Sequence, residues 1–367
     1  MLKVLKNQKK IKMKNKKILL FLLWSLLTNL ITFSQTPAND PHWQLKWEDN
    51  FNTYDNSKWR KANYAIHESE PQLYLADQIW TGGGNLIIEC NNIPIECPTN
   101  PPTYNWVCDT CIKGKTYKYR SGLIWTENSY NTQFGYIEAR MKLPWRRAGN
   151  KTWGLFPAFW TMLNVSPGTT ASEIDIFEMF AGEYNEPNTL NTCIHRCYKG
   201  NIPPHAYPNC NNGDQSRPQT LSNFNYTSYH TYAIEWNKDR LVWYVDGNVI
   251  RTTTNHLIID PIRIILNLSI QPESKYHPPT SPTFKEYMYV DYVKVYNLKC
   301  DKLTVVNEIS NFNTYNYAVK KSISLSGTTT IPKNSNITLR ATDFIELKAG
   351  FFIDTNRELY LDVTPCQ

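Results

Sequence analysis

Between about Trp43 and Tyr296 the chain alternates apolar and polar residues in short runs separated by turns. This alternation is typical of strands that bury one face, and β-branched and aromatic residues fill many of the apolar positions. The clearest runs are residues 85–89, 134–142, 241–245, 262–268 and 288–296. We see no long stretch with a helical period. Many short strands over about 250 residues predict an all-β sandwich or barrel.

The pattern changes after Cys300. Aromatic residues become rarer, Thr, Ser and Asn become more frequent, and short alternating runs follow at residues 322–325, 336–339, 344–347 and 358–361. Turns containing Gly327, Pro332 and Gly350 separate these runs. We expect a second, small all-β domain of stacked strands over residues 300–367. It offers no acid/base constellation, and spacing, polymer binding and surface retention all remain open as its role.

The N-terminal residues have the order of a secretory signal peptide. A Lys-rich stretch from Lys3 to Lys17 precedes an apolar run that continues to about Phe33, and Ser34-Gln35 then opens a polar segment. The alternative is a single membrane anchor, although Thr28-Asn29 interrupt the apolar run. We therefore predict that residues 1–35 are a signal peptide and that the mature protein is secreted, periplasmic or held at the cell surface, without a membrane span.

The net charge argues against a nucleic-acid partner once this leader is removed. The whole chain carries a formal charge of +7. Residues 1–35 contain eight lysines and no acidic residue, so removing them leaves a charge of −1. A nearly neutral mature protein has no general attraction for polyanions. The aromatic fraction of 13% suits sugar rings, and it equally suits the interior of a sandwich.

The nine cysteines fit an exported protein with disulfides. They fall in two clusters and a separate pair: Cys90, Cys97, Cys108 and Cys111; Cys193, Cys197 and Cys210; and Cys300 with Cys366. The spacings Cys108-x-x-Cys111 and Cys193-x-His195-x-Cys197 also resemble metal-ligand spacings. We favour disulfides over metal ligands at these positions. The odd count leaves at least one thiol unpaired or paired outside the chain.

Residues 173–178 concentrate three acids on one predicted strand. Side chains alternate along a strand, so Glu173 and Asp175 share one face and Ile174 and Ile176 point into the core. Strict alternation would turn Glu178 toward the core. A β-bulge near Phe177 would add one residue and return Glu178 to the face of the other two acids.

Three acids on one face are costly unless they are used. Like charges at close range raise the pKa of at least one carboxyl, as a general acid near neutral pH requires. The arrangement suits a retaining glycosidase, whose two carboxyl groups lie about 5–5.5 Å apart. An exposed acidic strand face or a calcium site would give the same spacing. The spacing alone leaves these alternatives open.

Residues 173–178 resemble the E-x-D-x-x-E signature of glycoside hydrolase family 16, in the form found in its laminarinase, agarase, porphyranase and carrageenase-like members. The resemblance extends, in family order, to further blocks at residues 47–51 with Trp59, 119–122, 134–144, 156–160, 230–236, 244–247 and 290–296. The C-terminal segment resembles small stacked-strand modules on secreted enzymes of Bacteroidetes-type bacteria. The family implies a jelly-roll β-sandwich with an open cleft over residues 36–299, and no cofactor for catalysis.

The resemblance also assigns roles to individual residues. It implies that Glu173 is the nucleophile, Glu178 the acid/base and Asp175 an assisting carboxylate. Trp160 would form an aromatic platform near the cleaved bond, with core packing as the alternative. His195 would contact substrate, or it would be a packing or surface histidine between two cysteines.

Three further residues have weaker assignments. Glu138 and Arg140 alternate on a strand that we expect to line the cleft, where they would bind sugar or, as we favour, form a structural ion pair with each other. The family implies a structural Ca²⁺ on the convex face, for which Asp291 is the best match as a ligand.

The resemblance implies a monomeric endo-acting β-glycanase whose partner is a polysaccharide, with β-1,3-glucan of the laminarin type as the leading substrate. The alternative substrate is an algal galactan such as agar, porphyran or carrageenan. Sulfated substrates call for basic residues in the cleft, and Arg146, Arg147 and Arg196 are candidates. A non-catalytic carbohydrate-binding protein is the third hypothesis. Such proteins usually lose one of the two glutamates, and this chain keeps both.

Overall fold

The chain divides into two compact units. The larger unit is Lys46–Val295, and the smaller combines Met1–Leu45 with Tyr296–Gln367. The sequence predicted a boundary between residues 299 and 300. The computed structural model describes residues 2–4, 9–11, 43–67, 69–104, 107–126, 130–163, 171–184, 186–197, 217–237, 240–255, 261–306, 319–329, 336–352 and 358–363.

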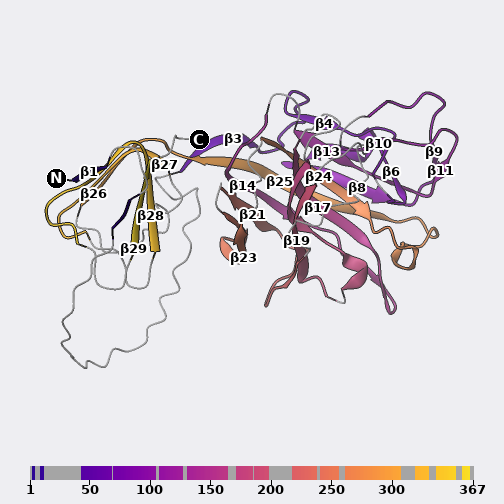
Figure 1. Cartoon of the computed structure of the whole chain (residues 1–367). Coiled ribbons are helices and arrows are strands. Elements are labelled where there is room, and N and C mark those ends of the chain that lie inside the picture. The colour runs from indigo at the N-terminus through magenta and orange to yellow at the C-terminus, as the bar shows by residue number, and fades with distance from the viewer. Residues whose placement is uncertain are drawn as a thin grey trace. The chain divides into compact units, whose positions relative to one another are not determined.

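The larger unit contains two largely antiparallel sheets (Figure 1). In the described residues, the first sheet has twelve strands in the order β10-β5-β6-β12-β8-β25-β14-β21-β22-β23, with β3 paired to β25 and β7 to β8. The strands are β3 (Trp43–Asp49), β5 (Ala65–Ile66), β6 (Gln72–Tyr74), β7 (Ile79–Gly82), β8 (Asn85–Asn91), β10 (Asp109–Thr110), β12 (Tyr119–Ser121), β14 (Gly135–Lys142), β21 (His230–Trp236), β22 (Arg240–Val245), β23 (Asn248–Thr254) and β25 (Lys285–Leu298).

The second sheet carries the acidic strand. Its seven described strands have the order β20-β19-β18-β17-β24-β13-β4. They are β4 (Trp59–Lys61), β13 (Leu123–Thr126), β17 (Leu155–Leu163), β18 (Ala171–Glu178), β19 (Thr189–Cys197), β20 (Arg217–Thr220) and β24 (Ile262–Ile270). Short pairs and 3₁₀ turns complete the unit: β9 (Ile95–Glu96) with β11 (Thr116–Tyr117), β15 (Arg147–Ala148) with β16 (Lys151–Thr152), η2 (Ala76–Gln78), η3 (Ala181–Glu183) and η4 (Ser274–Tyr276). The predicted all-β sandwich is confirmed.

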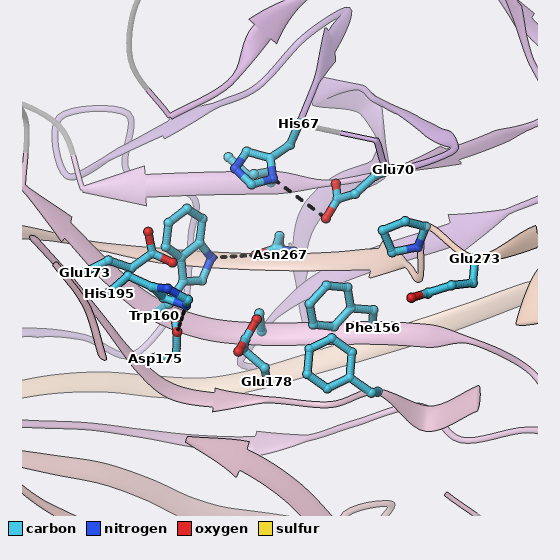
Figure 2. Close-up of a pocket in the computed structure, with 14 residues that line it drawn as sticks. His67, Glu70, Phe156, Trp160, Glu173, Asp175, Glu178, His195, Asn267 and Glu273 are labelled. Carbon is cyan, nitrogen blue, oxygen red and sulfur yellow. Dashed lines mark hydrogen bonds and ion pairs between the residues drawn. The ribbon is translucent and has the colours of Figure 1, made fainter. Parts of the chain in front are cut away.

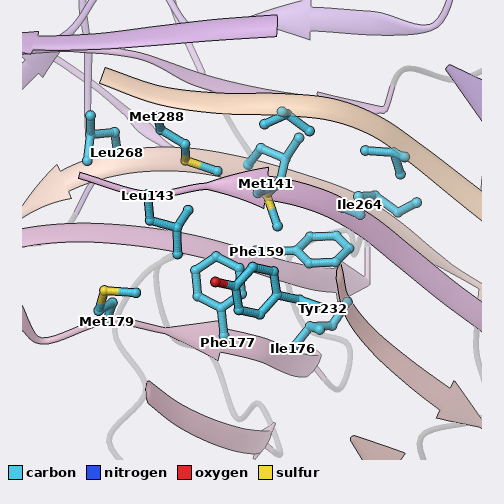
Figure 3. Packing of buried hydrophobic residues seen from close by; sticks show 14 of the residues in the cluster. Met141, Leu143, Phe159, Ile176, Phe177, Met179, Tyr232, Ile264, Leu268 and Met288 are labelled. Atoms are coloured by element: carbon cyan, nitrogen blue, oxygen red, sulfur yellow. The ribbon is translucent and has the colours of Figure 1, made fainter. Parts of the chain in front are cut away.

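One apolar core lies between the two sheets. Met141 on β14 and Met288 on β25 come from the first sheet, and Phe159 on β17 and Ile264 on β24 come from the second. All four are buried in one cluster, and Figure 3 shows how they meet. Each buried side chain of this kind contributes about 1.5–3 kcal/mol. Every residue of β24 is buried, and this strand lies inside its sheet, between β17 and β13.

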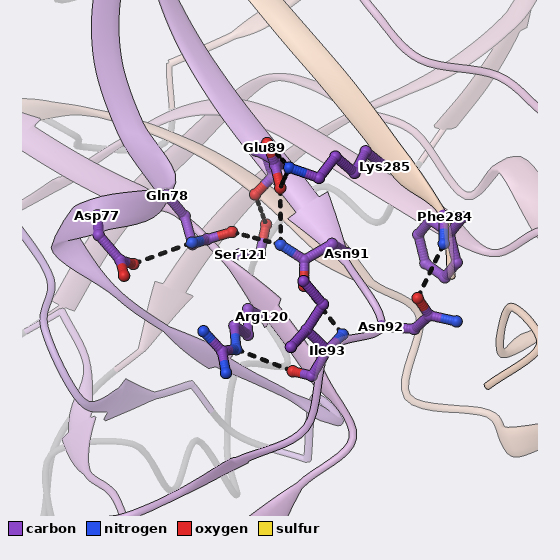
Figure 4. A network of polar contacts seen from close by, with 10 residues as sticks. All are labelled: Asp77, Gln78, Glu89, Asn91, Asn92, Ile93, Arg120, Ser121, Phe284 and Lys285. Carbon is purple, nitrogen blue, oxygen red and sulfur yellow. Dashed lines mark hydrogen bonds and ion pairs between the residues drawn. The ribbon is translucent and has the colours of Figure 1, made fainter. Parts of the chain in front are cut away.

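A polar network fastens β8 to β25 in the first sheet (Figure 4). Asn91 donates from Nδ2 to Gln78 Oε1 at 2.7 Å and to Glu89 Oε1 at 2.8 Å. Lys285 on β25 lies 3.3 Å from the same Glu89 oxygen. Glu89 is 6% exposed, so its charge needs these partners. The network fixes the register of two strands that are far apart in the sequence.

The cysteines only partly follow the predicted disulfides. Cys97 and Cys111 form a disulfide with a Cα–Cα distance of 6.0 Å, and Cys300 is also disulfide-bonded. Cys90 and Cys108 are buried thiols. Burial raises the pKa of both thiols, which keeps them protonated and unreactive.

The prediction was wrong for Cys193, which is a buried thiol. Cys210, Cys366 and the side chain of Cys197 lie outside the described residues. The spacing did not show which cysteines meet, because that depends on the strand register.

The smaller unit stacks parallel strands. Its described sheet has the order β2-β29-β28-β27-β26 for β2 (Lys9–Ile11), β26 (Lys302–Val306), β27 (Val319–Ser326), β28 (Asn336–Leu347) and β29 (Glu358–Val363), with β1 (Leu2–Val4) paired to β28. Leu303, Ile323 and Ile345 occupy matching positions on successive strands and are buried together. The described residues contain no helix long and apolar enough to cross a membrane, and the apolar run before Phe33 lies outside them.

Phe177 offers a test of the core beneath the acidic strand. Its ring is fully buried, 4.6 Å from the Tyr232 ring and 6.3 Å from the Phe159 ring between centroids. Phe177→Ala should lower the free energy of unfolding by about 3–5 kcal/mol, because it leaves a cavity between the sheets. Val249→Ala, at a side chain that is 51% exposed, should change it by less than about 0.5 kcal/mol. Equilibrium denaturation measures both, and similar values for the two variants would contradict this packing.

Candidate active site

A β-bulge brings the three acids of β18 onto one face. Glu173 pairs with His195 and Asp175 with Cys193, whereas Glu178 pairs with Asn191 after a register shift. The same shift occurs against β17. Two consecutive residues, Ile176 and Phe177, are both buried in the core as a result. The bulge predicted near Phe177 is therefore confirmed.

The bulge is held from the opposite sheet. A bulge leaves backbone groups without partners in the ladder, and a buried carbonyl needs a donor. The indole Nε1 of Trp243 on β22 donates to the Asp175 carbonyl oxygen at 2.8 Å. Trp243 is itself fully buried and lies under the Arg251 guanidinium, 4.5 Å from ring centroid to Cζ. This hydrogen bond fixes the position of the acidic strand relative to the opposite sheet.

The acids face a cleft of ≈ 460 Å³ on the outer side of the seven-stranded sheet (Figure 2). Figure 2 shows Glu173, Asp175 and Glu178 along one side of this cleft. Asp175 is 1% exposed, and both glutamates are half-buried. The described residues that line the cleft are His67, Glu70, Leu123, Phe156, Ala158, Trp160, Glu173, Asp175, Glu178, Phe180, His195, Asn267, Pro272 and Glu273.

His195 neutralises part of this acidic face. Its Nε2 lies 3.2 Å from Asp175 Oδ2, and its side chain is 42% exposed to the cleft. Burial opposes the charged imidazole, but hydrogen bonds with Asp175 and Cys193 and the charge of Glu173 together raise the pKa of His195. The histidine is therefore protonated near neutral pH, and it lies in the cleft rather than on a remote surface.

Trp160 lies in the cleft wall and is tied to a chain of hydrogen bonds. Its Nε1 donates to Asn267 Oδ1 at 2.7 Å, and Asn267 donates to Ser269 Oγ at 2.5 Å. Ser269 Oγ lies 2.7 Å from the Tyr74 hydroxyl, which donates to Glu70 Oε2 at 2.6 Å. These hydrogen bonds thus connect two residues that line the cleft, Trp160 and Glu70. Trp160 also packs in a buried cluster, so this side chain both lines the cleft and belongs to the core.

Several cleft residues were not predicted from the sequence. His67 and Glu70 come from the loop between β5 and β6, and their Nδ1 and Oε1 atoms lie 3.8 Å apart. The Phe156 and Phe180 rings stack with their centroids 4.6 Å apart, and Phe156 lies near Glu178 (Figure 2). His67 and Glu70 are far from the acidic strand in sequence and belong to no motif. Phe156 begins the predicted 156–160 block, but nothing in that block indicated the stacking.

The predictions for Glu138 and Arg140 were wrong in position and in partner. Both lie on β14, in the twelve-stranded sheet, and neither lines the cleft. Arg140 Nη1 contacts Asp291 Oδ2 at 2.6 Å instead of pairing with Glu138. Burial raises the pKa of Glu138, and its hydrogen bonds are to Tyr292 and Tyr136. Alternation along one strand could not show which of two sheets the strand joins.

Asp291 does not fit the predicted calcium site. Calcium takes six to eight oxygen ligands, usually with carboxylates free to coordinate it. The Asp291 carboxylate already pairs with the Arg140 guanidinium, and that guanidinium also lies 4.6 Å from the Tyr229 ring centroid. A cation already neutralises the proposed ligand. We therefore do not propose Asp291 as a ligand of a structural calcium ion.

Comparisons with known proteins agree with this architecture. Residues 97–269 match the family model for glycosyl hydrolases family 16. A glucan endo-1,3-beta-glucosidase A1 of Niallia circulans is 28% identical over 285 residues, which cover 69% of this chain and 37% of that protein. A beta-glucanase of Rhodothermus marinus is 26% identical over 303 residues, covering 75% and 93%. The endo-beta-1,3-glucanase from Pyrococcus furiosus superposes with a TM-score of 0.53 and 26% identity, covering 70% and 95%.

Some of the relatives are much longer than the region that matches this chain. The chain spans about a third of the length of the first curated relatives that it matches, 35–37% in each case. The family match itself contains β17, β18, β19 and most of β24, which carry the acids and the tryptophan. On the family match, the fold and these strands together, residues 97–269 are similar to glycosyl hydrolases family 16.

Proposed function

We propose that this protein is a retaining, endo-acting glycoside hydrolase that cleaves a β-linked polysaccharide. The observation that carries the proposal is the bulge, which turns Glu173 and Glu178 toward the same cleft on either side of Asp175. The Glu173 carboxylate attacks the anomeric carbon, while the Glu178 carboxyl protonates the departing glycosidic oxygen. Glu178 then removes a proton from the water that releases the covalent glycosyl-enzyme.

Asp175 and His195 support the nucleophile in this proposal. Asp175 lies between the two glutamates on β18, and its charge is balanced by His195 at 3.2 Å. The protonated imidazole also acts on Glu173, its cross-strand neighbour. It therefore favours the ionised form of the carboxylate that must attack.

We propose β-1,3-glucan of the laminarin type as the substrate. Five carboxylates line the described part of the cleft, from Glu70, Glu173, Asp175, Glu178 and Glu273, and no arginine or lysine lines it there. Such a cleft repels a sulfated polymer and accepts a neutral one. The relatives named for β-1,3-glucan cleavage support the same choice.

The basic residues considered for a sulfated substrate do not change this choice. Arg146 pairs with Glu286 at 2.9 Å, outside the cleft lining. Arg147 is exposed and likewise does not line the cleft. The Arg196 side chain and residues 198–216 lie outside the described residues. A non-catalytic sugar-binding protein would not need two glutamates on either side of an aspartate in one cleft.

We further propose that the protein is secreted after removal of residues 1–35 and acts as a monomer. The charged and apolar order of the leader supports export. The Cys97–Cys111 disulfide suits an oxidising compartment. The mass of the protein recovered from the culture medium tests the cleavage.

The substrate is tested by incubating the protein with laminarin, mixed-linkage glucan, agarose, porphyran and carrageenans. We expect reducing-sugar release from laminarin, because its chain is neutral. We also expect chain length to fall faster than reducing ends accumulate, as internal cleavage requires. Release from a sulfated galactan alone would replace the glucan proposal, and release from none of the polymers would contradict the enzyme proposal.

The two glutamates are distinguished by matched amide variants. Glu173→Gln should reduce turnover at least about 10³-fold on every substrate, because it removes the attacking oxygen. Glu178→Gln should lose about 10²–10⁴-fold on polysaccharide, and far less on an aryl glycoside whose leaving group needs no proton. Glu186→Gln, at an exposed loop position outside the cleft lining, is the control. Equal losses on both substrates for Glu178→Gln would exclude it as the general acid.

The charge of His195 should appear in the pH profile. The raised pKa keeps the imidazole protonated through the range in which the carboxyls ionise. His195→Gln removes this cation, so the acidic limb of kcat/KM against pH should move up by about one pH unit. His230→Gln, on β21 of the other sheet, should leave that limb in place. An unmoved limb in His195→Gln would show that the histidine does not act on the nucleophile.

A further inference from the structure

A cysteine, a histidine and an aspartate surround one point on the cleft face of the acidic strand. Cys193 and His195 are two residues apart on β19 and therefore share a face. Asp175 is the direct cross-strand partner of Cys193. One ligand atom from each of the three side chains lies within 4.8 Å of the other two.

This donor set is chemically unusual for the floor of a sugar-cleaving cleft. Thiolate sulfur, imidazole nitrogen and carboxylate oxygen are the ligands that Zn²⁺ takes in proteins, at about 2.3, 2.0–2.1 and 2.0–2.2 Å. Tetrahedral bonds of these lengths place ligand atoms roughly 3.3–3.8 Å apart. The three atoms need to converge only slightly, and the His195 side chain is 42% exposed, so the site can be reached from solvent.

A second observation points to the same place. Asp175 Oδ2 is buried and lies 3.2 Å from His195 Nε2, and within the described residues it has no further hydrogen-bond donor. Buried carboxylate oxygens are nearly always satisfied, so an oxygen left with a single ion-pair contact calls for a ligand. Cys193, at 1% exposed, stands opposite it in the ladder.

We propose that Asp175, Cys193 and His195 form an inhibitory site for a soft divalent cation, represented by Zn²⁺. Binding breaks the thiol S–H bond and the imidazole Nε2–H bond, and both protons pass to solvent. The cation then bonds to the sulfur, the nitrogen and a carboxylate oxygen, with its fourth position open to the cleft. The inhibitory part of this inference depends on the proposed function; the binding part does not.

We expect inhibition because the bound cation would occupy the two side chains that support Glu173. Asp175 and His195 are the residues that orient and charge-balance Glu173, and the cation would engage both. A positive ion beside Glu173 would also reduce its nucleophilicity. The thiolate makes the site selective for Zn²⁺ and Cd²⁺ over Ca²⁺ and Mg²⁺, which prefer oxygen ligands.

Binding is tested on the full chain, after chelation and removal of the chelator, by titration with Cd²⁺. A cadmium–thiolate bond gives an ultraviolet charge-transfer band. We expect the band to saturate at one equivalent in the wild-type protein and to be absent from Cys193→Ser. Cys108→Ser, which replaces a buried thiol outside this group of three donors, is the matched control and should keep the band. A band that persists in Cys193→Ser, or no band in the wild type, would overturn the proposal.

A second variant separates loss of a ligand from loss of the fold. His195→Asn keeps the thiol, so the band should remain but require at least about tenfold more Cd²⁺. Thermal unfolding of each variant without metal shows whether it is folded. Unchanged Cd²⁺ affinity in folded His195→Asn would exclude the histidine as a ligand.

Inhibition is measured on whichever polysaccharide the protein hydrolyses. Zn²⁺ should abolish turnover of the wild type reversibly, with recovery on adding a chelator, while Ca²⁺ and Mg²⁺ should not. Cys193→Ser should lose at least about tenfold in sensitivity to Zn²⁺, relative to its own rate without metal. Equal sensitivity in this variant would refute the inhibitory site. If no polymer is hydrolysed, the proposed function fails, whereas the cadmium band still decides the binding site.

Discussion

The hydrogen bond from the Trp243 indole to the Asp175 carbonyl holds the geometry on which the cleft depends. The bulge in β18 is what places Glu178 beside the other two acids, and a bulge interrupts the backbone ladder. Leaving a buried carbonyl without a donor costs about 1–3 kcal/mol. Trp243 supplies the donor from the opposite sheet at 2.8 Å. The position of the catalytic strand is thus set by the core and not only by its neighbours in the sheet.

The acidic face is possible because its charge is distributed among different environments. Asp175 is buried and lies against the protonated His195, while Glu173 and Glu178 reach partly into solvent. The charges come from two neighbouring strands: β18 carries the three acids, and β19 carries the protonated His195. The same closeness of Asp175, His195 and Cys193 that balances charge also gathers donors for a soft metal. The proposed support of the nucleophile and the proposed metal site therefore rest on the same three side chains.

The sequence predicted the strand and its bulge because the period of apolar residues carries that information. Two apolar residues in succession, Ile176 and Phe177, break the alternation and mark the extra residue. The place of Arg140 was missed because both sheets contain alternating strands, and only pairing decides which sheet a strand joins. Glu70 was missed because it lies in a loop far from the acidic strand in sequence, and only the fold brings it to the cleft.

The chain of hydrogen bonds beneath the cleft has a direction. Each group in the chain, beginning with the Trp160 indole, donates a hydrogen bond to the next group. The Glu70 carboxylate accepts the last of these hydrogen bonds. Hydrogen bonds in such a chain polarise one another, so a change at one group affects the others. A substitution at Asn267 or Ser269 would therefore disturb Trp160 and Glu70 together, although neither of the two would itself be changed.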